Sequence, residues 1–409
     1  MIDISLDDFG LPKSAKGLNV CIVSYSRILK RESVSLKAAL QACGFRVSFA
    51  GDMDGLMKQF ADGWYPGGRY TLLTKLKVKS YFLLSSMLRK RDCSKESYYL
   101  LINSGGNHQW FHEAAQLKLH EMGASDRLYF YDIERNRISK YEKPVLGYLE
   151  YHVSWHCNLK CKGCDHYSNL YDKPLFGDVE QYRKNLLRLR ELFDHIEQIR
   201  LLGGEPFLNR QIGDFVKATK DVFPDTDLRI VSNGLLIPGL GRDLLELLRG
   251  YGVAVDISNY PPTAKILGKI KQVLTDAGIP FEITPQIREF RYILGSKRTN
   301  RMHRTFRHCP LRNCHFLHDD GRLSMCGIPI FYDAAKDKLK AEREVGDSDW
   351  VDLYRAADGY EVLEKFSKAI PLCDYCVDVR ENAFFPWQGQ YTQELRDEDV
   401  PGFVKPARG

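Results

Sequence analysis

The chain has 409 residues, of which 44% are hydrophobic and 27% are charged, enough apolar material for two or three globular domains of ~100–200 residues each. The formal net charge of +6 is too small to indicate nucleic-acid binding by itself. The acidic start lacks the apolar stretch of a secretory signal, and no apolar run reaches the ~20 residues of a membrane span. We therefore exclude collagenous, disordered, disulfide-rich secreted and integral membrane classes and expect a cytoplasmic protein without a nucleic-acid partner.

Residues 1–145 are expected to form a small Rossmann-like α/β domain. Apolar, β-rich runs alternate with helical patterns, an order that favours a parallel sheet. The strand-like runs are 18–25, 46–51, 97–103 and 127–133, and the helical patterns are 32–44 and 108–123. The sequence does not contain a Gly-rich phosphate fingerprint here. A role in holding a substrate or carrier is a hypothesis for this domain.

A basic segment interrupts that domain at residues 69–91. It contains seven Lys or Arg residues and no acidic one, interleaved with Leu and Phe. One interpretation is a long helix with a solvated basic side. The other is a surface that meets an anionic partner such as the face of a membrane.

A second α/β series occupies residues 146–300. Strands are expected at 148–155, 198–202, 228–232, 253–258 and 280–284, and helices at 179–196, 212–222, 242–248 and 264–277. This alternation predicts a parallel sheet, open or curled into a partial (β/α) barrel. Active residues in such sheets lie at the carboxyl ends of strands. The chemistry is therefore expected in the loops after Trp155, Leu202, Ser232 and Ser258.

Clustered cysteines in a cytoplasmic chain indicate metal ligands before disulfides. The loop after the first core strand holds Cys157, Cys161 and Cys164 in a CxxxCxxC pattern. Three thiolates can bind three irons of a cubane cluster and leave the fourth iron open. On spacing alone the alternative is zinc, with His156 or His166 as a fourth ligand.

The loop after the next strand is Gly203-Gly204-Glu205-Pro206. Two glycines permit close approach of a ligand to the backbone, and a buried carboxylate there suits a ligand amine. CxxxCxxC followed by GGEP, in this order and separation, resembles the two signatures of the radical S-adenosylmethionine (SAM) superfamily.

That resemblance implies a 4Fe–4S cluster on Cys157, Cys161 and Cys164 whose open iron chelates SAM. It implies a 5′-deoxyadenosyl radical that abstracts hydrogen from the substrate, and an electron donor such as flavodoxin or ferredoxin. Gly203, Gly204 and Glu205 would receive the methionine amino end. Polar residues at later strand ends would contact the methionine carboxylate and ribose, or serve only as turn residues and caps: Ser232, Asn233, Ser258 and Asn259. Gly163 departs from the family, which usually has an aromatic residue before the third cysteine.

Residues 301–409 contain a second cysteine group. The stretch 315–326 predicts a hairpin around an Asp-Asp-Gly turn, and a CxxC follows near the end of the chain. The arrangement resembles the auxiliary-cluster ("twitch") extension of SPASM/twitch radical SAM enzymes. By that resemblance a second 4Fe–4S cluster would be held by Cys309, Cys326, Cys373 and Cys376. Cys314 is an alternative to Cys309, and structural zinc on the same cysteines is the alternative to a cluster.

The segment Arg288–Arg307 carries seven Lys or Arg residues against one Glu. It is interpreted either as a clamp for a phosphate or carboxylate or as a mobile basic loop. The leading hypothesis is hydrogen abstraction from a small, anionic, carbohydrate-type substrate such as a sugar or nucleotide sugar, which gives oxidation or epimerisation. Cys314 is the candidate hydrogen donor for epimerisation. The alternatives are epimerisation or crosslinking of a ribosomal peptide and, more remotely, a non-catalytic zinc-stabilised binding protein.

Overall fold

The computed structural model describes residues 19–23, 40–41, 46–50, 97–103, 109–132, 137–171, 174–339, 343–390 and 404–405. The described residues fall into two compact units, one that runs up to Gly147 and one that begins at Tyr148. The basic segment 69–91 and most of the helix expected at 32–44 lie outside the described residues. Within them, no helix combines the length and the apolar character needed to cross a membrane.

The first unit contains a sheet in the order β2-β1-β3-β4-β5. Its strands are β1 (Asn19–Val23), β2 (Arg46–Ala50), β3 (Tyr98–Asn103), β4 (Leu128–Asp132) and β5 (Arg137–Lys140). The pairs β1–β2, β1–β3 and β3–β4 are parallel, and β4–β5 is antiparallel. Helix α4 (Gln109–Glu121) follows β3. The described strands therefore confirm the predicted mixed α/β character of this part.

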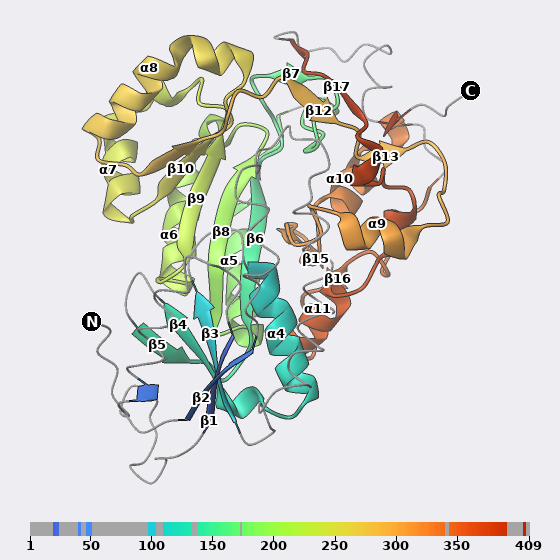
Figure 1. Ribbon diagram of the computed structural model, residues 1–409. Helices are drawn as coiled ribbons and strands as arrows, with labels where there is room; N and C mark the ends of the chain where they lie inside the picture. Colours follow the sequence, from blue (N-terminus) through green and yellow to red (C-terminus); the bar gives the residue numbers. More distant parts are fainter. Residues whose placement is uncertain are drawn as a thin grey trace. The chain divides into compact units, whose positions relative to one another are not determined.

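The second unit is built on a sheet in the order β11-β10-β9-β8-β6-β14-β15-β16 (Figure 1). Its first five strands in the chain are β6 (Val145–Ser154), β8 (His195–Gly203), β9 (Asp227–Ser232), β10 (Ala254–Ile257) and β11 (Phe281–Ile283). β8, β9, β10 and β11 pair in parallel. The expected parallel α/β core is thus present, and its strand ends share one edge.

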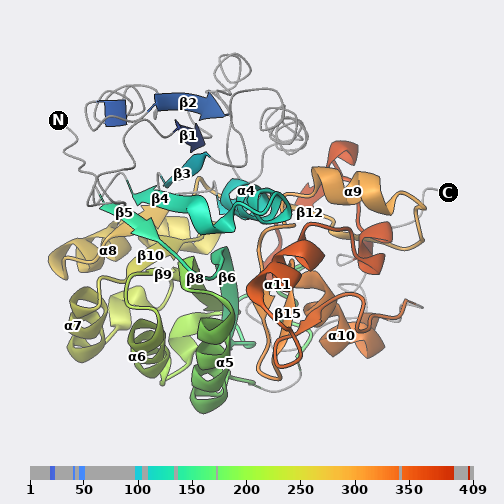
Figure 2. The same cartoon turned by 90° about the horizontal axis from the view of Figure 1, so that it is seen from below.

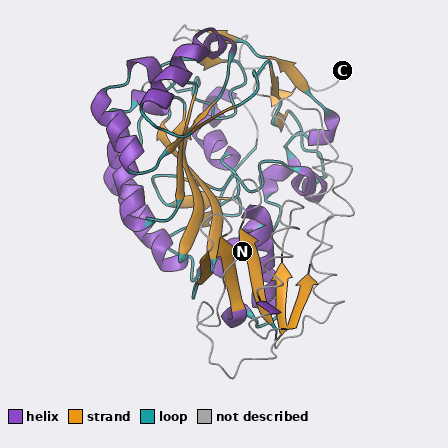
Figure 3. Ribbon diagram, turned by 60° about the vertical axis from the view of Figure 1, so that its left-hand side comes forward, coloured by secondary structure: helices purple, strands orange, loops and turns teal. Residues whose placement is uncertain are grey.

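Four helices cover one face of this sheet (Figures 2 and 3). They are α5 (Val179–Leu192), α6 (Ile212–Val222), α7 (Arg242–Gly250) and α8 (Pro261–Asp276). Side chains alternate along a strand, so Tyr151 of β6 faces the helices and packs on Tyr182 and Phe215, with ring centroids 4.3 and 5.7 Å away. The helix expected at 179–196 is shorter than predicted, because Phe193 has extended backbone angles and Ile196 is buried in β8.

The predicted extension adds strands to the same sheet. β14 (Phe316–Leu317) pairs in parallel with β6 and antiparallel with β15 (Arg322–Ser324), which forms the expected hairpin. Gly321, with φ at 85°, sits in its turn. The remaining elements of this unit are α9 (Met302–His308), α10 (Ile328–Leu339), α11 (Gly359–Phe366), β7 (Lys160–Cys161), β12 (Glu289–Arg291), β13 (Leu294–Gly295), β16 (Val351–Asp352), β17 (Phe384–Pro386), β18 (Gly389–Gln390), β19 (Val404–Lys405) and the 3-10 helices η4 (Pro206–Leu208), η5 (Ile237–Gly239), η6 (Pro371–Asp374) and η7 (Val379–Glu381).

Candidate functional site

The CxxxCxxC loop lies at the carboxyl end of β6. Cys157 and Cys161 are 8% and 6% exposed and form a buried apolar cluster with Leu159. Burial raises the pKa of the Cys157 thiol to about 12, and the nearby charge of Glu205 adds to the rise. The thiols therefore hold their protons until a metal displaces them, as expected of ligands in an apolar site.

The two glycines of GGEP are required by the protein's own backbone. The N–H of Gly204 donates to the carbonyl of Ser154 at 2.7 Å, and the N–H of Glu205 donates to the carbonyl of His156 at 2.9 Å. A Cβ atom on Gly203 would lie 2.0 Å from the oxygen of Ser154, and one on Gly204 would lie 2.2 Å from the oxygen of His156. The sequence interpretation assigned these glycines to ligand approach, whereas here they let the end of β8 touch the start of the cysteine loop.

Glu205 is fully buried, and its carboxylate joins two strand ends. It accepts hydrogen bonds from the Ser232 hydroxyl at 2.8 Å and from the backbone N–H groups of Asn233 and Phe207 at 2.9 and 3.2 Å. Burial raises the pKa of Glu205 to about 7, although these hydrogen bonds lower it. Both carboxylate oxygens are thus engaged by protein donors, and the side chain holds the ends of β8 and β9 together.

The predicted polar residues at the later strand ends gather around this carboxylate. The side-chain amide of Asn233 donates to Asn158 at 2.7 Å and lies 3.7 Å from the sulfur of Cys157. The N–H of Ser258 donates to the carbonyl of Ser232 at 2.9 Å. Asn259 is 8% exposed, and its side-chain oxygen is buried without a hydrogen-bond partner among the described residues. Buried polar atoms are rarely left unpaired, so this oxygen stands out among the polar groups at the strand ends.

Residues 152–268 match the Radical SAM superfamily. This part of the chain is a radical SAM domain. It contains the cysteine loop, GGEP and all four of the polar strand-end residues.

Curated proteins similar to the chain include GTP 3',8-cyclases. The protein from Campylobacter jejuni subspecies doylei is 33% identical over 115 residues, which cover 26% of this chain and 33% of that protein. The protein from Sulfurimonas denitrificans is 32% identical over 148 residues, which cover 34% of this chain and 43% of that protein. The similarity thus spans less than half the length of these relatives.

Among solved structures, BtrN in complex with AdoMet and 2-DOIA matches with a TM-score of 0.35 and 16% identity, covering 62% of this chain and 98% of that one. AnSMEcpe with bound AdoMet matches with a TM-score of 0.35 and 13% identity, covering 55% and 85%.

Residues 384–390, here called the closing segment, complete the wall around the cysteine loop of the radical SAM domain. Trp387 stacks on Tyr260 with ring centroids 5.7 Å apart, and both rings pack against the buried cysteine cluster. The Trp387 indole nitrogen is buried and has no hydrogen-bond partner of normal geometry among the described residues. It nevertheless lies near enough to Cys161 to oppose the rise in that thiol's pKa, which burial and Cys164 cause. Gly163 has φ at 65°, which disfavours an aromatic residue there.

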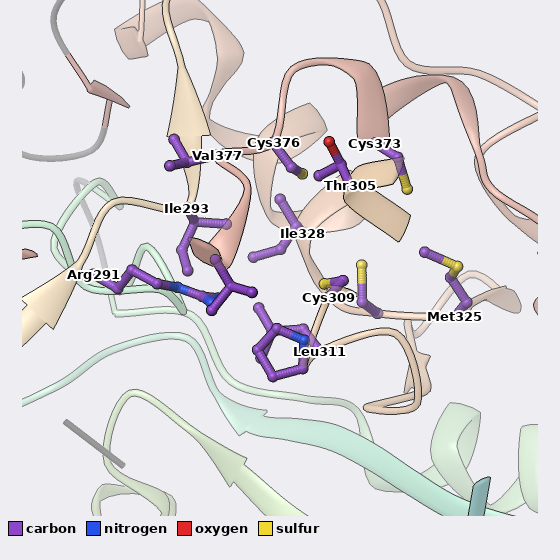
Figure 4. A pocket seen from close by; sticks show the side chains of 13 residues that line it. Arg291, Ile293, Thr305, Cys309, Leu311, Met325, Ile328, Cys373, Cys376 and Val377 are labelled. Atoms are coloured by element: carbon purple, nitrogen blue, oxygen red, sulfur yellow. The ribbon is translucent and has the colours of Figure 1, made fainter. Parts of the chain in front are cut away.

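The second cysteine group surrounds an apolar cavity (Figure 4). Four of the cysteines line it: Cys309, Cys326, Cys373 and Cys376. Burial raises the pKa of Cys326 well above its usual value, and the charges of the other three thiols raise it further. These four thiols are therefore close neighbours. Among the described residues, however, no three His, Cys, Asp or Glu side chains converge as ligands of a single metal ion.

Cys314 lies elsewhere. It is absent from the residues that line the cavity, and its charge acts on Tyr148 and Arg200 instead. The structure thus brings Cys309, rather than Cys314, together with the other three predicted ligands.

The basic segment Arg288–Arg307 is partly engaged in internal ion pairs. Arg298 donates to Asp374 at 2.5 Å, and Arg304 lies 3.6 Å from Asp378. Arg301 contributes its backbone N–H to Asp374. Two of the cations proposed as an anion clamp therefore hold the segment against the CxxC region.

Sequence reasoning missed a polar row on the sheet face that points away from α5 and α6. The hydroxyl of Tyr148 donates to Glu150 at 2.6 Å, and ring nitrogens of His152 and His166 lie 2.9 Å apart. Burial holds the pKa of His152 well below its usual value, and His166 and His318 lower it further. The alternation of polar residues at 148, 150 and 152 was a visible signal, because side chains two apart on a strand share a face.

Proposed function

We propose that the chain is a radical SAM enzyme that abstracts hydrogen from a carbon of a small polar, carbohydrate-type substrate, with oxidation or epimerisation as the outcome. Cys157, Cys161 and Cys164 would hold a 4Fe–4S cluster, and the ends of β8, β9 and β10 would hold SAM. The cluster and SAM together supply the 5′-deoxyadenosyl radical when bound. The observation that carries the proposal is the meeting of two buried thiols and one partly buried thiol with GGEP and a buried, unpartnered Asn259 oxygen at one sheet edge.

A second cluster on Cys309, Cys326, Cys373 and Cys376 is part of the proposal. Four thiolates around one zinc ion at ~2.3 Å would all lie within ~4 Å of one another. In a cubane each thiolate binds a different iron, so the sulfurs lie farther apart; the iron and zinc content of the reconstituted protein separates the two.

The substrate class rests on two considerations. The similar curated proteins carry the name of a reaction on GTP, a phosphorylated nucleoside, so a nucleotide or nucleotide sugar is the first class to test. Tyr148 and Glu150 of the polar row give hydrogen-bonding groups for hydroxyl-rich ligands. An external one-electron donor such as flavodoxin or ferredoxin is required by the chemistry.

Iron and sulfide content after anaerobic reconstitution tests the cofactor assignment. We expect about eight irons per chain in the wild type and about four in a Cys157/Cys161/Cys164→Ala triple variant. Four irons that fall to none would contradict the auxiliary cluster, and no iron in either protein would contradict the whole proposal.

Hydrogen transfer tests the substrate assignment. The reconstituted, reduced protein is incubated with SAM and with panels of nucleotides, nucleotide sugars, sugars and peptides, and 5′-deoxyadenosine is quantified. A substrate deuterated at the reacting carbon should transfer deuterium into 5′-deoxyadenosine. Stimulation by peptides alone would favour the ribosomal-peptide alternative and overturn the carbohydrate class.

A further inference from the structure

Two arginines near the second cysteine group lack a carboxylate partner among the described residues: Arg291 lines the cavity, and Arg343 packs beside the CxxC. Arg343 is 5% exposed. One of its terminal nitrogens donates to the carbonyl of Gly295 at 2.6 Å, and the other is buried without a partner. Its guanidinium lies over the rings of Tyr332 and Tyr375, 5.1 and 4.8 Å from their centroids, and Tyr375 stands inside the CxxC.

Arg291 is the second unpaired cation. It comes from β12, lines the cavity with the four cysteines, and extends toward their space (Figure 4). No ion pair or side-chain hydrogen bond is formed by its guanidinium with any described residue.

Neighbouring arginines behave differently. Arg298 pairs with Asp374, and Arg304 and Arg380 both pair with Asp378. This region therefore contains carboxylates, but they already pair with Arg298, Arg304 and Arg380.

The positive charges of Arg291 and Arg343 lie close to the second cysteine group, where they would stabilise negatively charged thiolates. Arg291 lines the cavity together with Cys376, and Arg343 donates to the carbonyl of Gly295, the residue after Leu294, whose backbone bridges to Cys376. A buried guanidinium without an anion is strongly unfavourable, and so are several thiolates gathered without cations. Each set is thus the natural complement of the other.

One buried carboxylate also acts on the site. Asp349 is 2% exposed and accepts the backbone N–H groups of Leu372 and Gly346 at 3.0 and 3.2 Å. Because Leu372 directly precedes Cys373, this carboxylate adds negative charge beside the cysteines and leaves the two arginines to balance them.

We propose that Arg291 and Arg343 are the counter-ions of an occupied tetrathiolate site on Cys309, Cys326, Cys373 and Cys376. The inference rests on the proposed function, in which these cysteines bind a cluster. Four thiolates around either an oxidised cubane or one zinc ion leave two negative charges, and two guanidiniums neutralise them. Because reduction adds a negative charge, the same cations favour electron uptake by the site.

The test uses the full chain with the Cys157/Cys161/Cys164→Ala background, in which only the auxiliary site is loaded. Arg291→Gln, Arg343→Gln and the double variant are compared with Arg355→Gln, a control at an exposed arginine that already has Asp352 as its partner. After anaerobic reconstitution, iron and zinc are quantified and the reduction potential is measured by an EPR-monitored titration. We expect Arg291→Gln and Arg343→Gln each to disfavour reduction about tenfold, which lowers the reduction potential by ~59 mV for a one-electron couple. The potential of the control should change little.

The outcomes separate this inference from the proposed function. Iron loading with equal potentials in all variants would overturn the counter-ion role and leave the cluster assignment intact. No metal in the background protein would overturn the auxiliary site and the counter-ions with it. If zinc is bound instead, faster loss of zinc to a chelator in the two arginine variants supports the role, and equal loss overturns it. Should Arg343→Gln fail to fold, Arg343→Lys, which keeps the charge, is expected to preserve the wild-type potential while Arg291→Gln still lowers it.

Discussion

The backbone of Gly389 pairs in antiparallel register with that of Cys161. The N–H of Lys162 adds a hydrogen bond to the carbonyl of Gln388 at 2.8 Å. At its other end the closing segment contains β17, which pairs with β12. Arg291 is the last residue of β12. The strand that pairs with the radical SAM cysteine loop therefore comes from the closing segment, near the C-terminal end of the chain.

Trp387→Phe is expected to preserve the ring stack on Tyr260 while it removes the N–H near Cys161. Hydrogen bonds to cluster sulfurs raise the reduction potential, so the potential of the first cluster should fall. The measurement is an EPR-monitored titration in a Cys309/Cys326/Cys373/Cys376→Ala background. Phe385→Leu, on the same segment, serves as the control, and an unchanged potential in Trp387→Phe would remove the indole from this role.

Gly203→Ala and Gly204→Ala should each destabilise the metal-free protein by at least about 2 kcal/mol, because the added Cβ meets backbone oxygen. Gly239→Ala and Gly241→Ala are matched controls, since a Cβ at either position has nothing within 4 Å, and they should stay within about 0.5 kcal/mol. Urea unfolding checks both. Equal stability of the four variants would refute the proposed backbone contact.

Cys309→Ser should halve the iron content, whereas Cys314→Ser should leave it near the wild-type value. The reason is that Cys309 lines the cavity with the other three cysteines and Cys314 does not. Iron analysis after identical reconstitution decides the matter. The reverse pattern would mean that Cys314 is the fourth ligand.

Asp333→Asn should cost up to about 1 kcal/mol at pH 7, a value limited by the partial exposure of the pair. Asp333 lies 2.8 Å from Arg322. Arg322 is the first residue of the hairpin strand β15, which ends shortly before Cys326. Burial raises the pKa of Asp333, but the hydrogen bonds and charges of Arg322 and Lys336 together lower it by more, so the net shift is downward.

A depressed carboxyl pKa gives stability that is present above the unfolded value of ~3.9 and is lost as the pH falls through the folded value. The difference between wild type and Asp333→Asn should therefore close below about pH 3.9. Unfolding followed across pH, with Asp214→Asn in an exposed pair as control, checks this. A constant difference down to pH 3 would contradict the ion-pair explanation.

Local patterns predicted much of the core. Strands such as His195–Gly203 and their following loops were visible because apolar residues and glycines lie close together in the sequence. The grouping of Cys309 with Cys373 could be anticipated only by resemblance. Helix α5 was predicted too long, since Phe193 and Ile196 continue its apolar pattern although they are extended.

Other structural features have no signal in the neighbouring sequence and could not be predicted from it. β7 and β18 are two residues long, too short for any periodicity, and their pairing joins distant parts of the chain. The burial of Arg343 likewise depends on Tyr332 and Tyr375, which approach it from separate segments. Contacts of this kind are set by the tertiary fold rather than by the neighbouring sequence.

The pairing of Cys161 with Gly389 also bears on biogenesis. At ~5–20 residues per second, a ribosome needs roughly ten to forty-five seconds to travel from the one position to the other. During that interval Cys157, Cys161 and Cys164 are already synthesised, but the strand that pairs with Cys161 and the indole of Trp387 are not. The enclosure of this loop is thus completed only when nearly the whole chain has been made, and truncation near the C-terminus would impair a site that lies in the middle of the chain.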